Sequence, residues 1–418
     1  MIEENKKKIK ITDIELLIAV AFIVDIVCFA YQYMNVEYRV YSHWENIATT
    51  SRNNFITSGL VLVMMLCFFA AAVLSLIEKK RLNSAIMCVL ILIIFGTFWT
   101  VLAMRGDSIV TIVKSPVSPF VLIMSVLVFV GYNERAWEIT KKLVFISSIA
   151  YTFMSIFEII RFIINFGLET RLMLSGALYG IIVVIFFMYF TLLFNDGLLK
   201  KYKLLISIQI FLIISVTLVL QSRSWVVHSL LLMVIFIFKL STHYKNKTVY
   251  YLIVSLVGIV VLTLASSYLI TISGGLLDRM TDDSRTGQLE MFFSQVSFKD
   301  LMLGGGMRAG YSCFGDSNYQ FIDNLVIQTM FKYGIIPTVA YLTMIFVPLI
   351  YGFKHKESEA RKGIFFFVPW ILIMLGFAIF VSYSNNIYNY LIYFVIGRLS
   401  FLREKDRKAR ALGQLTLN

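Results

Sequence analysis

Long apolar runs alternate with short polar segments along almost the whole chain. Each run approaches the roughly 20 residues that a helix needs to cross the hydrocarbon of a bilayer. The pattern predicts twelve membrane-spanning helices, at residues 14–34, 55–77, 84–104, 117–132, 143–165, 176–194, 204–221, 225–240, 249–272, 335–353, 363–383 and 385–400. We therefore expect an all-α polytopic membrane protein in which residues 1–418 form a single integral membrane domain.

Composition supports this class of protein. Hydrophobic residues make up 59% of the chain and charged residues only 15%, which excludes a water-soluble globule of ordinary surface. The basic run from Lys6 to Lys10 precedes the first span without a small-residue cleavage site, so we expect a retained anchor and not a signal peptide. The net charge of +13 follows from membrane topology, and we expect no nucleic-acid partner.

One polar segment, residues 273–322, interrupts the apolar pattern. Charged groups are costly in the hydrocarbon layer, so this segment must be a large loop outside it, and we expect short helices within it. The chain ends in a basic tail, residues 401–418. The four cysteines show no metal-site spacing, and only Cys313 falls in the loop. We expect Cys313 alone to react with a thiol reagent applied from outside.

The distribution of basic residues predicts the sidedness. With a cytoplasmic N-terminus, 26 of the 38 Lys and Arg residues fall on the cytoplasmic side. Both termini are then cytoplasmic and the loop is extracytoplasmic. The count depends on a break within the apolar stretch 204–240, because reading that stretch as one helix abolishes the bias.

The two basic residue types separate between the sides. Nine of the 12 extracytoplasmic cations are Arg, whereas the cytoplasmic ones comprise 19 Lys and 7 Arg. The guanidinium fork binds phosphate or carboxylate with two hydrogen bonds, whereas Lys is a point charge. The outer arginines either bind an anion or anchor the helices at the membrane interface, and both interpretations stay open.

Two arginines stand near predicted helix starts. Arg223 lies in the segment Gln221–His228 between two spans, where it either holds a phosphate or acts as an interfacial anchor beside Trp225. Arg285 lies in Asp282–Phe293, which reads as a cap followed by an amphipathic helix. An anion is favoured at that helix end, although Arg285 also suits a local ion pair with the preceding aspartates.

Two further motifs close the loop. Three glycines, 304–306, precede Arg308 and predict either an anion-binding nest of backbone amides or a flexible turn; they do not form a P-loop. Asp323 and Asn324 open a helix that ends at Gly334. Asp323 is either the cap of this helix or a general base that faces a hydroxyl.

The order of these elements resembles the O-antigen polymerase and ligase superfamily. The resemblance covers about residues 205–355 and is carried by Ser222–Ser224 at an outer helix end, Ser284–Arg285 at a loop helix, the turn Leu303–Gly306 and the segment Asp323–Gly334. Ligases of this superfamily carry His where this chain has Asp323, so the resemblance points to the polymerases of O-antigen and capsular polysaccharide. It also implies a fold related to the membrane-embedded C-type glycosyltransferases.

The resemblance implies a glycosyltransferase that joins undecaprenyl-diphosphate-linked oligosaccharide units on the outer face of the bacterial cytoplasmic membrane. Asp323 would be the catalytic base, and Arg223, Arg285, Arg308 and Asn324 would bind substrate. No cofactor or metal is expected. Expected partners are the lipid-linked oligosaccharide, membrane lipids, and the chain-length regulator and flippase of the same pathway. A ligase-like transferase and a lipid-linked oligosaccharide flippase remain the alternatives. The sequence shows no internal repeat, which a flippase would be expected to have. A permease for anionic solutes would place its arginines in mid-span, and this sequence does not show that pattern.

Overall fold

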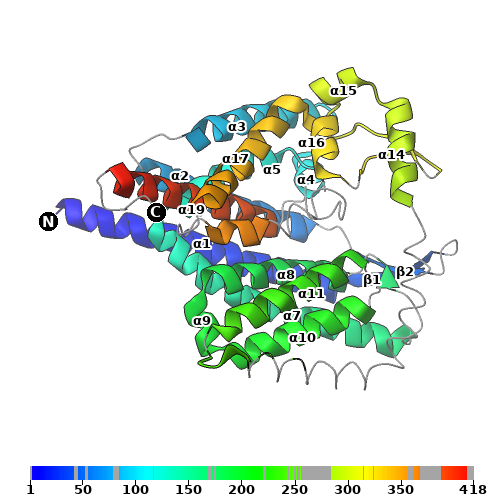
Figure 1. The fold of residues 1–418 in the computed structure, drawn as a ribbon. Helices are drawn as coiled ribbons and strands as arrows, with labels where there is room; N and C mark the ends of the chain where they lie inside the picture. Colours follow the sequence, from blue (N-terminus) through cyan, green and yellow to red (C-terminus); the bar gives the residue numbers. More distant parts are fainter. Residues whose placement is uncertain are drawn as a thin grey trace. The chain divides into compact units, whose positions relative to one another are not determined.

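The computed structural model is mostly helical. It describes residues 2–41, 46–51, 55–78, 84–115, 117–166, 172–173, 176–219, 223–242, 244–248, 251, 255, 284–313, 315–322, 324–355, 361–367 and 387–411. The chain divides into two compact units (Figure 1). Unit 1 comprises residues 1–28, 53–143 and 284–418, and unit 2 comprises residues 29–52 and 144–283.

Helix α1 (Ile2–Met34) begins in unit 1 and α7 (Glu134–Phe166) ends in unit 2. The other elements of unit 1 are α2 (Phe55–Glu78), α3 (Ser84–Ala103), α4 (Ile109–Lys114), α5 (Phe120–Ile123), the 3₁₀ helix η1 (Met124–Leu127), α6 (Val128–Tyr132), α14 (Ser284–Gln295), α15 (Phe298–Leu303), β4 (Tyr311–Cys313), β5 (Asp316–Tyr319), α16 (Leu325–Tyr333), α17 (Ile335–Lys354) and α19 (Ile387–Ala411). Residues 401–411, expected as a tail, continue α19 as helix.

Unit 2 contains the helices α8 (Gly176–Phe194), α9 (Asp196–Lys201), α10 (Lys203–Val219) and α11 (Arg223–Ser241). It also has a small sheet that the sequence does not predict, made of β1 (Val36–Tyr41), β2 (Asn46–Ser51) and β3 (Leu172–Met173). Strands β1 and β2 are antiparallel, with Val36 opposite Ser51, and β2 pairs with β3 in parallel.

Among the described residues, five helical segments are long and apolar enough to cross a membrane: 13–34, 55–78, 85–103, 134–165 and 335–354. Shorter apolar helices lie at 120–132, 180–194, 203–218 and 225–241. The predicted span 117–132 is instead three short consecutive helices, α5, η1 and α6, and is largely buried. The predicted spans 249–272 and 363–383 fall mostly outside the described residues.

The core of unit 1 depends on a close approach between α6 and α19. A Cβ at Gly131 would collide with the Phe394 carbonyl oxygen, and one at Gly397 with the carbonyl oxygen of Val128. Small residues permit such backbone contact between apolar helices, where dispersion replaces the hydrophobic effect as the main attraction. Around this contact α19 is buried on all sides from Tyr390 to Val395.

Hydrogen bonds between helices hold unit 2 together. The Gln209 side chain donates to Ser148 Oγ at 3.3 Å and to Thr152 Oγ1 at 3.4 Å, which links α10 to α7. The expected break in the stretch 204–240 is confirmed, because α10 ends at Val219 and α11 begins at Arg223. The chain reverses there, and the hydroxyls of Thr217 and Ser229 meet at 3.0 Å.

The polar segment of unit 1 folds into a compact set of elements, residues 284–333, which we call the loop module. Its helices α14, α15 and α16 confirm the prediction of short helices in the loop, and β4 pairs with β5 in an antiparallel hairpin. Ser297 caps α15 in a capping box with Asp300. In Figure 1, these helices lie at one end of unit 1, whereas the N-terminal end of α1 and the C-terminal end of α19 lie at the other.

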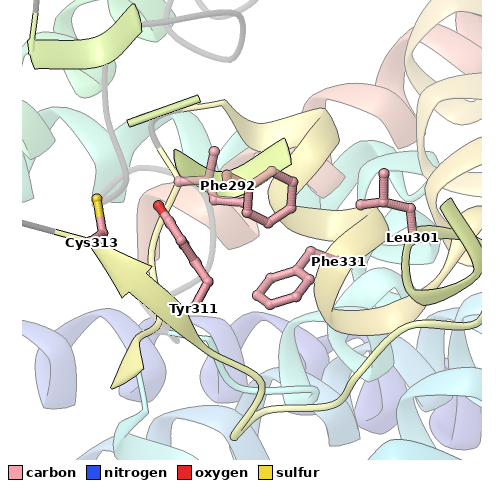
Figure 2. Close-up of a cluster of buried hydrophobic side chains, with 6 residues drawn as sticks. Phe292, Leu301, Tyr311, Cys313 and Phe331 are labelled. Carbon is pink, nitrogen blue, oxygen red and sulfur yellow. The ribbon is translucent and has the colours of Figure 1, made fainter. Parts of the chain in front are cut away.

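The loop module has a small hydrophobic core of its own (Figure 2). The Phe292 ring lies edge-on to Tyr311 and to Phe331, with ring centroids 5.1 Å apart in both pairs. Such edge-to-face pairs add to the stability that burial gives. Cys313 belongs to the same core and is only 2% exposed, and burial raises the pKa of its thiol. The sequence-based expectation that Cys313 reacts with an external thiol reagent is therefore wrong.

The sidedness is testable with an exposed residue of the same hairpin. In a variant that lacks the four natural cysteines, Ser317→Cys on β5 places a thiol where the side chain is exposed. We expect a membrane-impermeant maleimide to label this variant in intact spheroplasts. As a control, Lys405→Cys on α19 should label only after the membrane is opened. The reverse pattern would place the loop module in the cytoplasm.

Candidate functional site

Helix α14 carries Arg285 in its first turn, as the sequence predicts. The side chains of Gln288 and Phe292 lie on the buried face of this helix, whereas the side chain of Arg285 lies outside the described residues. The Gln288 amide donates to the Phe321 carbonyl oxygen at 3.4 Å. The positive end of α14 is thereby held beside the segment that leads to Asp323.

The cap of α16 is Asn324. Its side-chain oxygen accepts hydrogen bonds from the backbone N–H groups of Val326 at 3.0 Å and Ile327 at 3.1 Å. Asp323 therefore precedes the capping position in the sequence, and it lies outside the described residues. Because Asn324 already satisfies the helix end, Asp323 is not needed as its cap.

The glycines 304–306 do not form an anion-binding nest. The N–H of Gly304 donates to the Asp300 carbonyl, that of Gly305 to the Phe331 carbonyl at 2.8 Å and that of Gly306 to the Lys332 carbonyl at 2.9 Å. All three amides are thus occupied within the protein. Of the two interpretations that the sequence leaves open, the geometry favours the turn, in which Gly305 and Gly306 cap the C-terminal end of α16 and Gly304 caps that of α15.

The last four carbonyls of α16 are all satisfied. Gly334 N–H donates to Met330, the two glycine amides to Phe331 and Lys332, and the Trp99 indole to Tyr333 at 3.2 Å. The ring of Trp99 also lies against Gly306, where an added Cβ would approach it to 3.0 Å. This arrangement joins α15, α16 and the end of α3.

Lys332 is fully buried in the same place. Its ammonium group donates to the carbonyl oxygens of Met307 at 3.1 Å and Ala309 at 2.5 Å and lies 5.3 Å from the centre of the Phe331 ring. Within the described part of the chain no carboxylate forms an ion pair with it. Burial lowers the pKa of Lys332 to about 7. The turn that carries Arg308 is fixed around this amine.

Arg308 binds a partner within the protein. Its guanidinium donates from Nε and Nη2 to the two carboxylate oxygens of Asp107, each at 2.7 Å, and from Nη2 to the Gly106 carbonyl. This fork is the strong bidentate geometry of an Arg–carboxylate pair, and its hydrogen bonds lower the pKa of the Asp107 carboxyl. Arg308 therefore joins the loop module to the turn after α3, and its expected contact with substrate has no support in this geometry.

Arg223 belongs to unit 2, unlike the other candidate residues, and is the first residue of α11. Its side chain lies outside the described residues, whereas Trp225 and His228 on the next turns are buried. Tyr189 donates to the His228 carbonyl at 2.8 Å. His228 is therefore a packed residue of the unit.

Glu158 and Arg161, three residues apart on α7, form an ion pair with Arg161 Nη2 and Glu158 Oε2 3.1 Å apart. The described residues contain no group of three or more His, Cys, Asp or Glu side chains arranged for a metal ion.

Sequence reasoning missed the contributions of Trp99, Asp107 and Gln288, since each acts through a partner distant in the chain. A tryptophan at the end of an apolar span is the only local signal that was present.

Comparisons of the chain with protein-family models, with curated proteins and with solved structures gave no match. A functional assignment therefore depends on the chemistry of these residues and on the resemblance of the motifs.

The joint between α16 and α17 can be tested with one glycine. Gly334 has φ 89° and ψ 174°, a region that is essentially restricted to glycine, and a Cβ there would lie 2.8 Å from the carbonyl oxygens of Met302 and Leu303. We expect Gly334→Ala to destabilise the purified protein by about 1–3 kcal/mol and to lower its melting temperature.

Gly287 on α14 is the matched control, since a Cβ there would meet nothing within 4 Å. Alanine suits a helix interior better than glycine by roughly 0.5–1 kcal/mol, so Gly287→Ala should melt no lower than the natural protein. Equal melting temperatures for the two variants would contradict the proposed joint.

Proposed function

We propose that this protein polymerises polyprenyl-diphosphate-linked oligosaccharide units into a surface polysaccharide, at the outer face of a bacterial cytoplasmic membrane. The observation that carries the proposal is the pairing of two helix starts in the loop module. The first turn of α14, with Arg285, is held by Gln288 against the segment that ends in Asp323 and the cap Asn324. We assign the cation of Arg285 and the carboxylate of Asp323 to this region, and the Gln288 hydrogen bond supports this assignment.

The reaction joins two lipid-linked glycans. A hydroxyl oxygen of the incoming unit attacks the anomeric carbon of the growing glycan, and the bond from that carbon to the diphosphate oxygen breaks. The lipid diphosphate leaves with the electron pair, and the hydroxyl proton passes to a base. Negative charge develops on the leaving group, so preorganised donors near the diphosphate lower the barrier.

Arg285 suits the leaving group. The N-terminal end of α14 is the positive end of its helix dipole, and we assign the guanidinium fork of Arg285 to the diphosphate at this end. Arg223 stands at the corresponding end of α11 and is assigned the same class of ligand, a phosphate group. Arg308 is omitted from the substrate-binding residues because Asp107 occupies its fork.

Asp323 suits the base. Asn324 performs the capping, which leaves the neighbouring carboxylate free of that structural task. An aspartate carboxylate within reach of the attacking hydroxyl can accept its proton. Asn324 acts in this scheme by fixing the backbone on which Asp323 stands.

The Asp323 assignment makes a sharp prediction. Asparagine keeps the size and polarity of the side chain but does not accept a proton at neutral pH. We expect Asp323→Asn to retain the expression and melting temperature of the natural protein while losing on the order of 100-fold or more of polymerisation activity on purified lipid-linked units. Asn324→Ala is the control for a structural effect, and it should lower stability by about 1 kcal/mol.

In a strain whose only copy carries Asp323→Asn, surface glycan should shorten to single repeat units. Full-length chains that fail to attach to their acceptor would instead indicate a ligase, and lipid-linked units trapped inside the cell would indicate a flippase. Full activity of purified Asp323→Asn would remove this residue from the mechanism.

The arginines are tested by a substitution that keeps the charge. Arg285→Lys and Arg223→Lys each lose the bidentate fork, so we expect each to lose most polymer while the protein remains in the membrane. Arg105→Lys is the matched control, because Arg105 is exposed in the turn after α3 and has no assigned ligand. Chains of natural length in both test variants would show that Arg223 and Arg285 are interfacial anchors.

A further inference from the structure

The C-terminal half of α19 presents three arginines on one face. Arg403, Arg407 and Arg410 are separated by four and three residues, the spacing that aligns side chains along a helix. This half of α19 packs beside the C-terminal end of α17, at the end of unit 1 away from the loop module (Figure 1). The basic residues are therefore gathered around a joint between two helices.

Contacts with α17 hold this face in place. The Arg403 guanidinium lies 5.9 Å from the centre of the Tyr351 ring, and Arg410 Nη1 lies 2.8 Å from His355 Nδ1. Burial, followed by the charge of Arg410, lowers the pKa of His355, so the neutral ring accepts a hydrogen bond from the guanidinium. These contacts order two of the three arginines before any ligand arrives.

A cavity of about 430 Å³ lies between the helices, and we call it the basic groove. The three arginines, Lys354 and His355 line it together with apolar residues of α17, and none of the described residues that line it is a carboxylate. Glu404 lines an adjoining cavity, and Asp406 is near enough to affect His355. Over the ranges that the structure covers, no ion pair forms with any of the three arginines. The basic groove thus has an excess of positive charge.

The groove also contains an unsatisfied polar group. Tyr351 is 9% exposed and lines the cavity, and its hydroxyl has no hydrogen-bond partner among the described residues. A buried hydroxyl without a partner is costly, and native proteins rarely leave one so. A phosphate oxygen in the basic groove would provide the missing acceptor for this donor.

An apolar face leads to the groove along α17. Its exposed large side chains recur at helical spacing from the loop-module end to the basic groove: Ile336, Val339, Phe346, Ile350 and Phe353. In a membrane-embedded protein such a face contacts acyl chains. The basic groove therefore lies where the phosphate of a lipid would lie if its chains followed this face.

We infer that the basic groove binds the phosphate group of an anionic lipid. Basic pockets between membrane helices bind lipid headgroups of this class, with about 1 kcal/mol per Lys or Arg near the membrane surface, which is about fivefold in affinity. The positive-inside rule requires basic residues on the cytoplasmic side, but it does not require them to cluster on one helix face around a cavity. Arginine also exceeds lysine here, with four of the six basic residues between 398 and 410, whereas lysine predominates elsewhere on the expected cytoplasmic side.

The experiment measures lipid affinity of the full-length protein in a nonionic detergent by native mass spectrometry, with phosphatidylglycerol as the probe and phosphatidylcholine as the zwitterionic reference. We expect the variant R403Q/R407Q to bind phosphatidylglycerol about 25-fold more weakly than the natural protein. The variant K405Q/K408Q loses the same charge from α19 residues that do not line the groove, and it should bind within about twofold of the natural protein.

A second arm uses inorganic phosphate alone. If phosphate raises the melting temperature of the natural protein but not of R403Q/R407Q, the groove takes free phosphate as well as a lipid headgroup; no shift shows that the lipid is required. If R403Q/R407Q does not fold, the single variant R407Q should show about fivefold weaker binding of phosphatidylglycerol. Equal affinity in the natural protein and the arginine variants, or an equal loss in K405Q/K408Q, would overturn the inference.

Discussion

The last four backbone carbonyls of α16 require hydrogen-bond donors, and the residues that supply them hold the region around the candidate site in place. The C-terminal end of α16 lies where an apolar helix begins, and unsatisfied carbonyls there would be costly. Gly334, Gly305, Gly306 and Trp99 supply the donors from three separate segments of the chain. Because α16 is only nine residues long, fixing its last turn also fixes the position of its first turn and of Asn324.

The chemical roles then separate along unit 1. The loop module combines a rigid hydrophobic core with two helix starts that carry Arg285 and Asp323, which is the arrangement on which the proposed transfer reaction depends. The opposite end of the same unit gathers arginines between α17 and α19. A reaction that uses a lipid-linked substrate requires an enzyme fixed at a constant depth in the bilayer. A bound anionic lipid at the far end of α17 would contribute to that constancy.

The sequence predicts helix starts and ends well where neighbouring residues determine them. The start of α14, the break after Val219 and the end of α16 at Gly334 all follow from capping residues and apolar spacing. The failures concern partners far away in sequence. Nothing near Gly305 and Gly306 shows that their amides donate to the end of a helix about 26 residues later, and nothing near Arg308 points to Asp107 about 200 residues earlier. The predicted span 117–132 is not one long helix, and hydropathy does not show this because short helices enclosed by protein and helices that face lipid are equally apolar.

The close approach of Gly131 and Gly397 also sets the order in which the protein can assemble. Unit 2 is complete once residue 283 has been synthesised, whereas α6 must wait for α19, the last helix that the structure describes. Until then the segment 120–132 lacks its main neighbour, and its apolar surface needs another partner in the membrane or in the insertion machinery. Ribosomes that stop shortly before α19 should therefore release a chain with a finished second unit and an open first one, which quality-control proteases would recognise by that unfilled groove.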